Sequence, residues 1–406
     1  MYPTSYRNEF IKNWLMIGAI CIIIAISPIM ALFFAIIFYR QQYSFPFFIL
    51  FAFYFGWFYE PQLDLLNHYN HFKTLIGKNL FEAWVDTETI HLGREPYPVL
   101  FKYIVGQISV SPNFFSACAC SIYAMLFTYG VMGSIRDLYI QKKNLPALVI
   151  LIGIIFIVEY NWFLGLRFWS GAFVFIAFYI RYVRTSNTKY LFLSFLCVCF
   201  HFSLFTLCVI AVLNWFLKDN FKVRYILIVF GWIIRYIQIP VTAYVANLSI
   251  MDGLVKESFR NKSIVQSVTE RMDFFRTEGN LFYMIRNDIL FFNACFVLFV
   301  LWRLFGKKVF SCNPYLWGLI LIAYAFTNIG YADLIFYGRF YKVTLLLLYM
   351  YIFMCLIQAQ NEISVNIRLW MAALLFIPIL YAIATIAISQ REFLWKIKIW
   401  FNTFFF

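Results

Sequence analysis

The sequence predicts an all-α protein that crosses a membrane many times, and three observations support this prediction. Of the 406 residues, 63% are hydrophobic and only 13% are charged, whereas about 25% of the residues of a soluble domain are charged. The apolar residues form runs whose length suits membrane-spanning helices, which need about 20 residues. Basic residues stand singly or in small groups between these runs, as in the cytoplasmic loops of multi-pass proteins. This composition excludes a soluble enzyme, a disordered regulator and a small disulfide scaffold.

The apolar runs define the expected helices, because backbone polar groups in lipid must find their hydrogen-bond partners within the protein. We expect roughly 11–13 transmembrane or re-entrant helices in a single integral membrane domain over residues 1–406. The expected spans are 14–39, 44–59, 97–111, 113–135, 145–164, 168–184, 189–217, 223–247, 283–304, 314–330, 339–357 and 368–390. Ser27 and Pro28 interrupt the first span, which is therefore a kinked helix or a tight hairpin.

Basic loops predict how the chain is oriented. The richest short loops, 136–144, 181–189, 218–224 and 303–308, are expected in the cytoplasm. If both middle loops are cytoplasmic, the chain between them must enter the membrane and return, with His201 near the tip. We favour such a re-entrant pair of half-helices, which is allowed where the backbone is buried in protein. The alternative is one long tilted helix over 189–217, with the 218–224 loop outside.

Two polar segments, 59–96 and 248–282, are too long to be turns, and we expect them to be the larger extracytoplasmic loops. In the first segment, Leu65, Tyr69 and Phe72 recur at helical spacing. This spacing predicts an amphipathic helix that lies at the membrane interface.

Ionisable residues within or beside apolar runs are costly, so they are candidates for function. Arg167 lies between two spans and is either an interfacial arginine that reaches for water or a bidentate clamp on a phosphate. His201 lies in an apolar run and is either a structural histidine or a proton carrier and hydrogen-bond donor. Arg339 opens a late span, where it either pairs with Asp333 or contacts the substrate.

The first polar segment holds further candidates. Asp64 and His68 are four residues apart, so they share one face of the expected helix. Arg94 and Glu95 lie at the membrane boundary, just before an apolar run. We interpret Asp64, His68 and Glu95 as candidate bases, and Arg94 and Tyr69 as candidate substrate contacts.

No motif indicates a metal or an organic cofactor, and we expect neither. The histidines and acids are not in metal-ligand order, and no glycine-rich phosphate loop or nucleotide fingerprint occurs. The nine cysteines are scattered, nearly all in apolar runs, without the paired spacing of a zinc or redox centre. No basic cluster stands on a polar surface, so nucleic acid is not an expected partner.

Five short runs, in order along the chain, resemble the motifs of the Wzy/EpsG-like O-antigen or exopolysaccharide polymerase family. They are 60–69 (EPQLDLLNHY), 94–100 (REPYPVL), 165–172 (GLRFWSGA), 200–203 (FHFS) and 338–341 (GRFY). In the third run, Phe168 follows Arg167 where the family motif has glutamine.

This resemblance implies a glycosyltransferase of the bacterial cell inner membrane, with a fold like that of the C class of glycosyltransferases. Such enzymes are thought to polymerise undecaprenyl-diphosphate-linked oligosaccharide repeat units into O-antigen of lipopolysaccharide, capsule or exopolysaccharide. They transfer the growing glycan from its lipid carrier to a new lipid-linked unit on the periplasmic side. A flippase and a chain-length regulator are the implied protein partners.

The chemistry of glycosyl transfer from a diphosphate assigns roles to the candidates. Arg167 and Arg339 would bind the diphosphate, and His201 would donate or carry a proton. Asp64, His68 or Glu95 would accept a proton from the attacking hydroxyl. The alternatives are a lipid-linked glycan ligase or other lipid-dependent glycosyltransferase, a membrane acyltransferase, and a glycan flippase or transporter. A transporter would be expected to have two matched halves, which this sequence does not contain.

Overall fold

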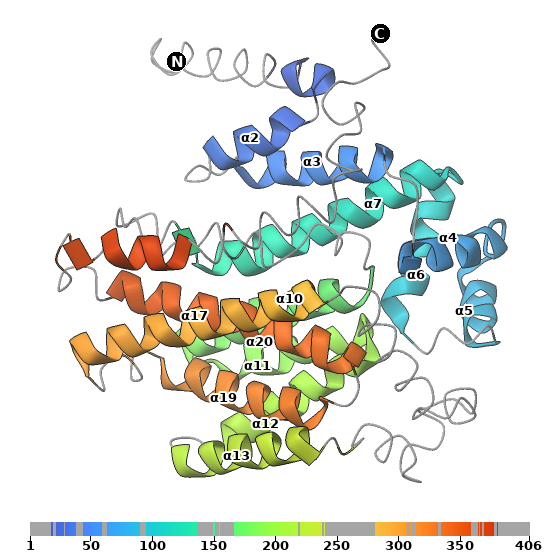
Figure 1. Ribbon diagram of the computed structural model, residues 1–406. Coiled ribbons are helices and arrows are strands. Elements are labelled where there is room, and N and C mark those ends of the chain that lie inside the picture. The colour runs from blue at the N-terminus through green and yellow to red at the C-terminus, as the bar shows by residue number, and fades with distance from the viewer. Residues whose placement is uncertain are drawn as a thin grey trace, which may run out of the picture.

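Helices make up all the regular structure in the described part of the chain (Figure 1), so the all-α prediction is confirmed for those residues. The structure is a computed structural model of the 406-residue chain. It describes residues 18, 22–27, 29–37, 44–58, 63–89, 95–135, 149–150, 154, 166–217, 220–237, 239, 281–306, 309, 313–331, 334–358, 364, 366–367, 369–376 and 380.

Most of the described helices lie within the apolar runs, whereas α4 and α5 form in the polar segment 59–96. The first group is α2 (Ile29–Ile37), α3 (Ser44–Phe58), α4 (Leu63–Thr74), α5 (Leu80–Thr89), α6 (Pro96–Ile108), α7 (Pro112–Met125) and a π-helical continuation, η1 (Leu126–Met132). The second group is α10 (Phe168–Thr185), α11 (Thr188–Ser194), the 3₁₀ segments η3 (Phe195–Cys199) and η4 (Phe202–Leu204), α12 (Phe205–Leu217), α13 (Phe221–Ile237), α17 (Leu281–Phe305), α19 (Pro314–Ile329) and α20 (Leu334–Gln358). The chain is non-helical at Ser27, between helical residues 22–26 and α2, where the sequence predicts an interruption.

Local sequence signals explain why several helices begin where they do. Three of them start with a proline, at Pro96, Pro112 and Pro314, where the missing N–H would have had no helical partner. Ser111 and Asn313 precede two of these prolines, and their side chains accept hydrogen bonds from backbone N–H groups of the first turn. These starts are therefore encoded by a few neighbouring residues.

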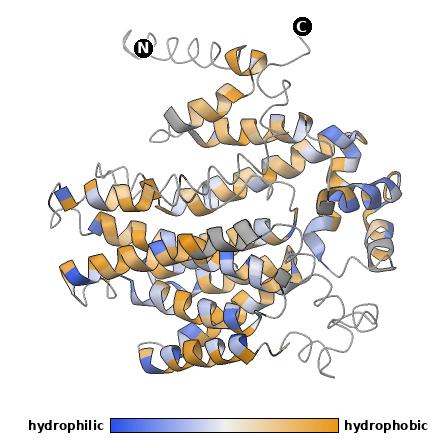
Figure 2. Ribbon diagram, viewed as in Figure 1, coloured by the Kyte–Doolittle hydropathy of each residue, from blue (hydrophilic) through white to orange (hydrophobic). Residues whose placement is uncertain are grey.

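Apolar residues dominate most of the helices, as the orange ribbon in Figure 2 shows. Two helices are long and apolar enough to cross a membrane by length and composition, Pro112–Ile135 and Phe336–Gln358. Five shorter apolar helices are Phe45–Phe58, Thr188–Cys199, Phe202–Leu217, Ile289–Phe305 and Pro314–Ile329. The larger number of spans that the sequence predicts stays a prediction.

The two expected extracytoplasmic segments have different outcomes. Within 59–96, the described residues form α4 and α5, and the predicted helical spacing is seen in α4, where Leu65, Tyr69 and Phe72 are buried. Almost all of 248–282, like the spans 145–164 and 368–390 over much of their length, lies outside the described residues.

The segment 188–217 forms a hairpin beside α10. Helix α11 and η3 run back along α10, the chain reverses direction around His201, and η4 and α12 run away again. Gly171 allows this close approach, because a Cβ there would overlap with Leu204 Cδ1 and would lie 2.8 Å from Phe200 Cβ. One continuous helix over 189–217 is not formed, and the chain reverses near His201 as expected, whereas its position in a membrane stays a prediction.

The other end of the hairpin is held by a buried arginine. Arg224 has none of its surface exposed, and its Nη2 donates to Asn214 Oδ1 at 2.9 Å and to Asn214 O at 3.3 Å. The amide of Asn214 donates in turn to the Tyr179 hydroxyl at 2.7 Å and to Tyr315 O at 2.8 Å. These contacts tie α10, α12, α13 and α19 together. The sequence places Arg224 at the end of the basic loop 218–224 and within the expected span 223–247. The structure places it in α13 with its side chain buried, and the cytoplasmic side of the loop stays a prediction.

Replacing Asn214 tests this arrangement. In Asn214→Ala, a buried guanidinium and a buried hydroxyl lose their hydrogen-bond partner, so we expect a loss of about 2–4 kcal/mol of stability. The measurement is the midpoint of thermal unfolding of the purified protein. The matched control is Asn70→Ala on the exposed side of α4, for which we expect a change within about 0.5 kcal/mol. Equal effects of the two substitutions would contradict the role of Asn214.

Candidate functional site

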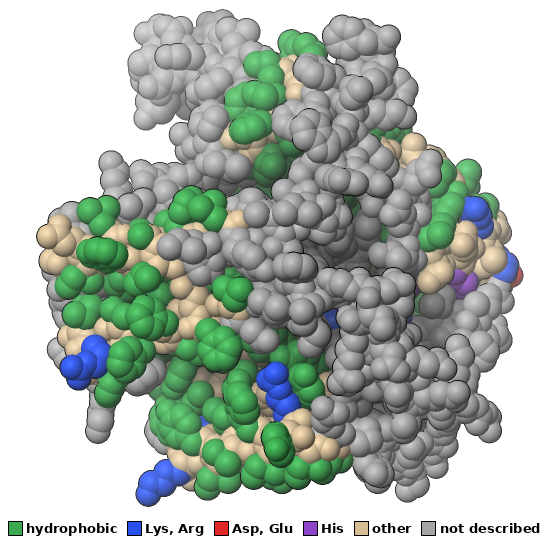
Figure 3. Space-filling model, viewed as in Figure 1, with side chains coloured by type: hydrophobic (Ala, Val, Ile, Leu, Met, Phe, Trp, Pro, Cys, Tyr) green, Lys and Arg blue, Asp and Glu red, His purple; other side chains and the backbone are tan. Residues whose placement is uncertain are grey.

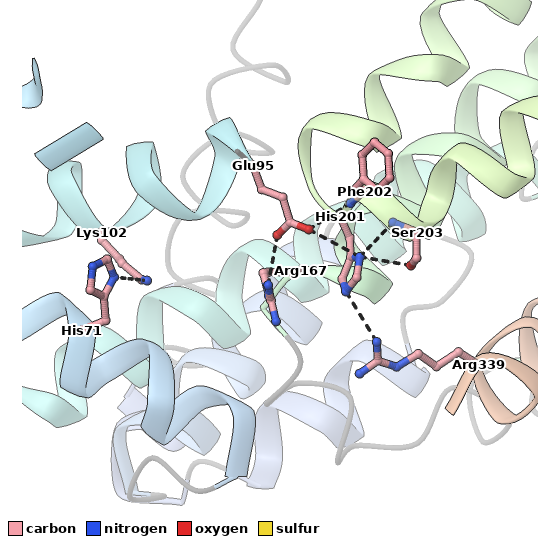
Figure 4. A network of polar contacts seen from close by, with 8 residues as sticks. All are labelled: His71, Glu95, Lys102, Arg167, His201, Phe202, Ser203 and Arg339. Atoms are coloured by element: carbon pink, nitrogen blue, oxygen red, sulfur yellow. Dashed lines mark hydrogen bonds and ion pairs between the residues drawn. The ribbon is translucent and has the colours of Figure 1, made fainter. Parts of the chain in front are cut away.

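Four side chains that the sequence singles out meet in one cluster: Glu95, Arg167, His201 and Arg339 (Figure 4). Each lies at or near the start of a helical segment. Glu95 and Arg167 directly precede α6 and α10, His201 precedes η4, and Arg339 lies early in α20. The cluster therefore joins four segments that are distant in the sequence.

The Glu95 carboxylate is the centre of the cluster. Its Oε2 accepts a hydrogen bond from Arg167 Nη1 at 3.1 Å, and its Oε1 accepts one from the backbone N–H of Phe202 at 2.9 Å. The same Oε1 lies 3.5 Å from His201 Nδ1. Glu95 precedes α6 but makes no capping bond with its side chain, so its carboxylate is directed at these partners. The two hydrogen bonds from Arg167 and Phe202 favour the charged form of the carboxylate, and its predicted role as a base stays a prediction.

The cluster is sheltered from solvent without being sealed. The side chains of Glu95, Arg167 and His201 are 7%, 18% and 16% exposed. Charge-assisted hydrogen bonds are stronger in such partly dry surroundings than in water.

His201 lies where the hairpin reverses direction, with extended backbone angles (φ −155°, ψ 122°). Its Nδ1 is 3.5 Å from Glu95 Oε1, 3.0 Å from Ser203 Oγ and 3.2 Å from the Ser203 N–H. Its Nε2 is 3.5 Å from Arg339 Nη1. A guanidinium donor thus faces Nε2, while Nδ1 has both a backbone donor and a carboxylate acceptor beside it, which suits a neutral imidazole with one N–H.

The contacts at Nδ1 favour different tautomers of the ring. The Ser203 N–H, at 3.2 Å, favours a lone pair on Nδ1, whereas the Glu95 carboxylate, at 3.5 Å, favours a proton there. The chemistry proposed below uses the tautomer with the proton on Nδ1 and the lone pair on Nε2, which a guanidinium faces. A carboxylate that orients an imidazole in this way leaves the far nitrogen able to accept a proton.

Arg339 is held partly by an aromatic ring. Its guanidinium carbon lies 5.2 Å from the centroid of the Phe168 ring, within the range of a cation–π contact. Phe168 also meets the His201 ring at 5.8 Å and at 83°.

The charges of these four side chains favour an anionic ligand. Two guanidinium groups outnumber one carboxylate, and the imidazole is neutral in the arrangement above. The helix starts at α6 and α10 add partial positive charge at the same place. A diphosphate, with oxygens suited to bidentate contact by arginine, fits this arrangement.

The other predicted site residues are not all found in the cluster. Tyr69 packs against the Phe115 ring at 5.7 Å, its hydroxyl donates to Val110 O at 3.5 Å, and Lys73 Nζ lies 4.6 Å from its ring centroid, so none of these contacts is with a member of the cluster. His68 is buried in α4, with 1% of its surface exposed. Arg94, Asp333 and the side chain of Asp64 lie outside the described residues, so the predicted pairing of Asp333 with Arg339 is outside them too.

Sequence reasoning missed a buried basic pair beside the cluster. Lys102 on α6 donates to His71 Nδ1 on α4 at 2.8 Å (Figure 4), and only 1% and 6% of the two residues is exposed. The signal was available, because Lys102 is an ionisable residue in the apolar run 97–111. The backbone N–H of Phe202, by contrast, has no signature in the sequence.

Comparisons with known proteins add nothing to this picture: no family model, no curated protein and no solved structure matches the chain. In the part of the chain that the structure describes, no group of three histidine, cysteine or acidic side chains could hold a metal ion.

The Glu95–Arg167 ion pair can be tested with a double-mutant cycle. Each of Glu95→Gln and Arg167→Gln leaves one charge without its partner, so we expect each to cost about 1–3 kcal/mol of stability. The double variant should lose less than the sum, by a coupling of about 1–3 kcal/mol, measured by thermal unfolding.

The control cycle combines Arg167→Gln with Glu82→Gln, an exposed acid in α5 whose carboxylate accepts from the Asn79 N–H. These two changes should be additive within about 0.5 kcal/mol. Additivity of the Glu95 and Arg167 changes would show that the ion pair does not form.

Proposed function

We propose that this chain is a membrane glycosyltransferase that polymerises undecaprenyl-diphosphate-linked oligosaccharide repeat units, for O-antigen, capsule or exopolysaccharide. One observation carries the proposal. Four of the five runs that resemble the polymerase motifs each contribute a side chain, Glu95, Arg167, His201 or Arg339, to one partly buried cluster. A set of short motifs chosen by sequence alone has little reason to converge in space unless the residues act together.

Exposed apolar surface supports the membrane part of the proposal. Ile226, Phe230 and Ile237 on α13, and Phe292 and Phe299 on α17, are each more than half exposed. Figure 3 shows hydrophobic side chains spread over the described surface on this face, with few basic ones between them. Soluble monomers rarely expose apolar patches of this kind, whereas lipid would cover them.

The direction of the helices supports a site on the outer side of the inner membrane. Arg181 and Arg184 lie near the end of α10, whereas Arg167 and the cluster lie at its start. Basic residues are retained on the cytoplasmic side. The cluster would therefore face the periplasm, where lipid-linked repeat units are joined in the reaction we propose.

The proposed reaction uses the four side chains in distinct ways. A hydroxyl of the incoming repeat unit attacks the anomeric carbon of the growing glycan, a new C–O bond forms, and the bond to the carrier diphosphate breaks. The diphosphate leaves with the electron pair, and Arg339 and Arg167 stabilise its charge, each by about 2–4 kcal/mol of the barrier. The hydroxyl proton passes to His201 Nε2. Glu95 is a positioning residue, because it acts through the Nδ1–H of His201.

The weak contact between Arg339 and His201 suits this sequence of events. At 3.5 Å, the hydrogen bond from Nη1 to Nε2 is at the long limit. A diphosphate would form stronger, charge-assisted bonds with the guanidinium and draw it away. Binding of the donor would thereby expose the Nε2 lone pair to the acceptor hydroxyl.

Arginine variants test the diphosphate contact. In Arg339→Ala and Arg167→Ala, we expect glycan polymerisation to fall by about 10²–10³-fold, since one charge contact to the leaving group is lost. The measurement is the ladder of glycan lengths in a host that lacks its own polymerase, where single repeat units should remain. Arg181→Ala, an exposed arginine at the other end of α10, is the control and should make a full ladder. A full ladder in either cluster variant would refute the diphosphate role of that arginine.

A second prediction concerns the proton acceptor. His201→Ala should lower polymerisation by about 10²–10⁴-fold with little change in the midpoint of thermal unfolding. If Glu95 works through His201, adding Glu95→Gln to His201→Ala should cost less than the product of the two separate losses. Independent, multiplicative losses would argue that Glu95 has its own role in the reaction, and a large loss of stability would favour a structural histidine.

A further inference from the structure

We infer that Phe168 is a positioning residue that holds Arg339 and His201 in the geometry needed to bind an anion; the anion's identity as a carrier diphosphate rests on the proposed function. The ring is only 4% exposed. It is the first residue of α10, directly after Arg167, and contacts both of the other basic members of the cluster.

The contacts of the ring are of two kinds. Its face attracts the Arg339 guanidinium, whose carbon lies 5.2 Å from the ring centroid. The His201 ring lies 5.8 Å away and nearly perpendicular, at 83°. An aromatic ring has a negative face and a positive edge, so it binds a cation on its face and prefers perpendicular neighbours.

This kind of contact suits an arginine that must bind a ligand. A ring face attracts a guanidinium without neutralising its charge, and it leaves the N–H donors in the guanidinium plane directed outward. Arg167, by contrast, gives one of its donors to the Glu95 carboxylate. Phe168 thus orients the Arg339 guanidinium by a contact with the ring face, which does not itself use the N–H donors of that guanidinium.

The surroundings fix the ring from two sides. Phe340, the residue after Arg339 on α20, packs on Phe168 at 5.5 Å and 78°. This packing of α20 against α10 fixes the position of Arg339 relative to the Phe168 ring. One turn along α10, Gly171 allows the hairpin that carries His201 to approach. The position of Phe168 therefore sets the spacing of α10, α20 and the hairpin together.

The first test reads the position of His201 without any substrate. The chain has four histidines, so the imidazole NMR spectrum of the purified, histidine-labelled protein is simple, and the His201 signal is the one lost in His201→Gln. We expect Phe168→Leu to shift this signal and Phe168→Tyr, which keeps the ring, to restore it. An unchanged His201 signal in Phe168→Leu would overturn the inference.

The second test reads the anion site with inorganic pyrophosphate by titration calorimetry. Loss of the ring face should weaken pyrophosphate binding by about three- to tenfold in Phe168→Leu, the size of a moderate cation–π contact, with recovery in Phe168→Tyr. Wild-type affinity in Phe168→Leu, or no saturable binding by the wild type, would contradict the anion role.

Phe173→Leu is the matched control on the same helix. Phe173 is fully buried and its described ring contacts are with Trp169, Tyr123 and Phe127. This variant should lose stability to a similar degree while keeping the His201 signal and pyrophosphate affinity, and equal effects on both readouts would show that Phe168 is merely structural. Neither readout requires glycan transfer, so failure of the proposed polymerase activity would be seen separately in the glycan ladder.

Discussion

One carboxylate holds the candidate site together. Glu95 accepts hydrogen bonds from the Arg167 side chain and from the Phe202 backbone, and lies close to the His201 ring. These partners come from α10 and from the hairpin beside it, while Glu95 itself precedes α6. A buried carboxylate without such donors would cost several kcal/mol, so the segments must meet at this point for the charge to be tolerated. The positions of both catalytic candidates, His201 and Arg339, depend on this meeting.

A buried charge also has hydrogen-bond partners at the open end of the hairpin, away from the reversal of the chain. Arg224 is buried among apolar helices, where the Asn214 amide and carbonyl accept its hydrogen bonds. At the reversal of the chain, the thiols of Cys197 and Cys208 both point at the carbonyl of Leu204, at 3.8 Å and 3.7 Å. The hairpin is therefore held by polar contacts at its tip, where the chain reverses, and at its open end. An apolar protein that interrupts a helix must supply such partners, because neither lipid nor an apolar core can hydrogen-bond to the exposed backbone.

The two arginines of the cluster differ in what surrounds them. Arg167 is paired with a carboxylate, which orients it and offsets its charge. Arg339 lies over the face of the Phe168 ring, the residue directly after Arg167, and this contact orients its guanidinium. In the proposed polymerase, both arginines would bind the diphosphate, and Arg167 would in addition hold Glu95.

The helical class and several helix starts follow from the sequence alone, because they depend on local features: apolar runs, prolines at first helical positions, and capping residues such as Ser111 and Asn313. The four members of the cluster could also be selected from sequence, since ionisable groups at the edges of apolar runs are costly and few. Their meeting could not, because it depends on contacts between residues 72 to 138 positions apart in the sequence. Tertiary structure alone decided that Phe202 offers a backbone N–H to Glu95, that Arg224 is buried, and that Tyr69 packs on α7. These outcomes follow from the packing of whole helices against one another, which no local pattern in the chain encodes.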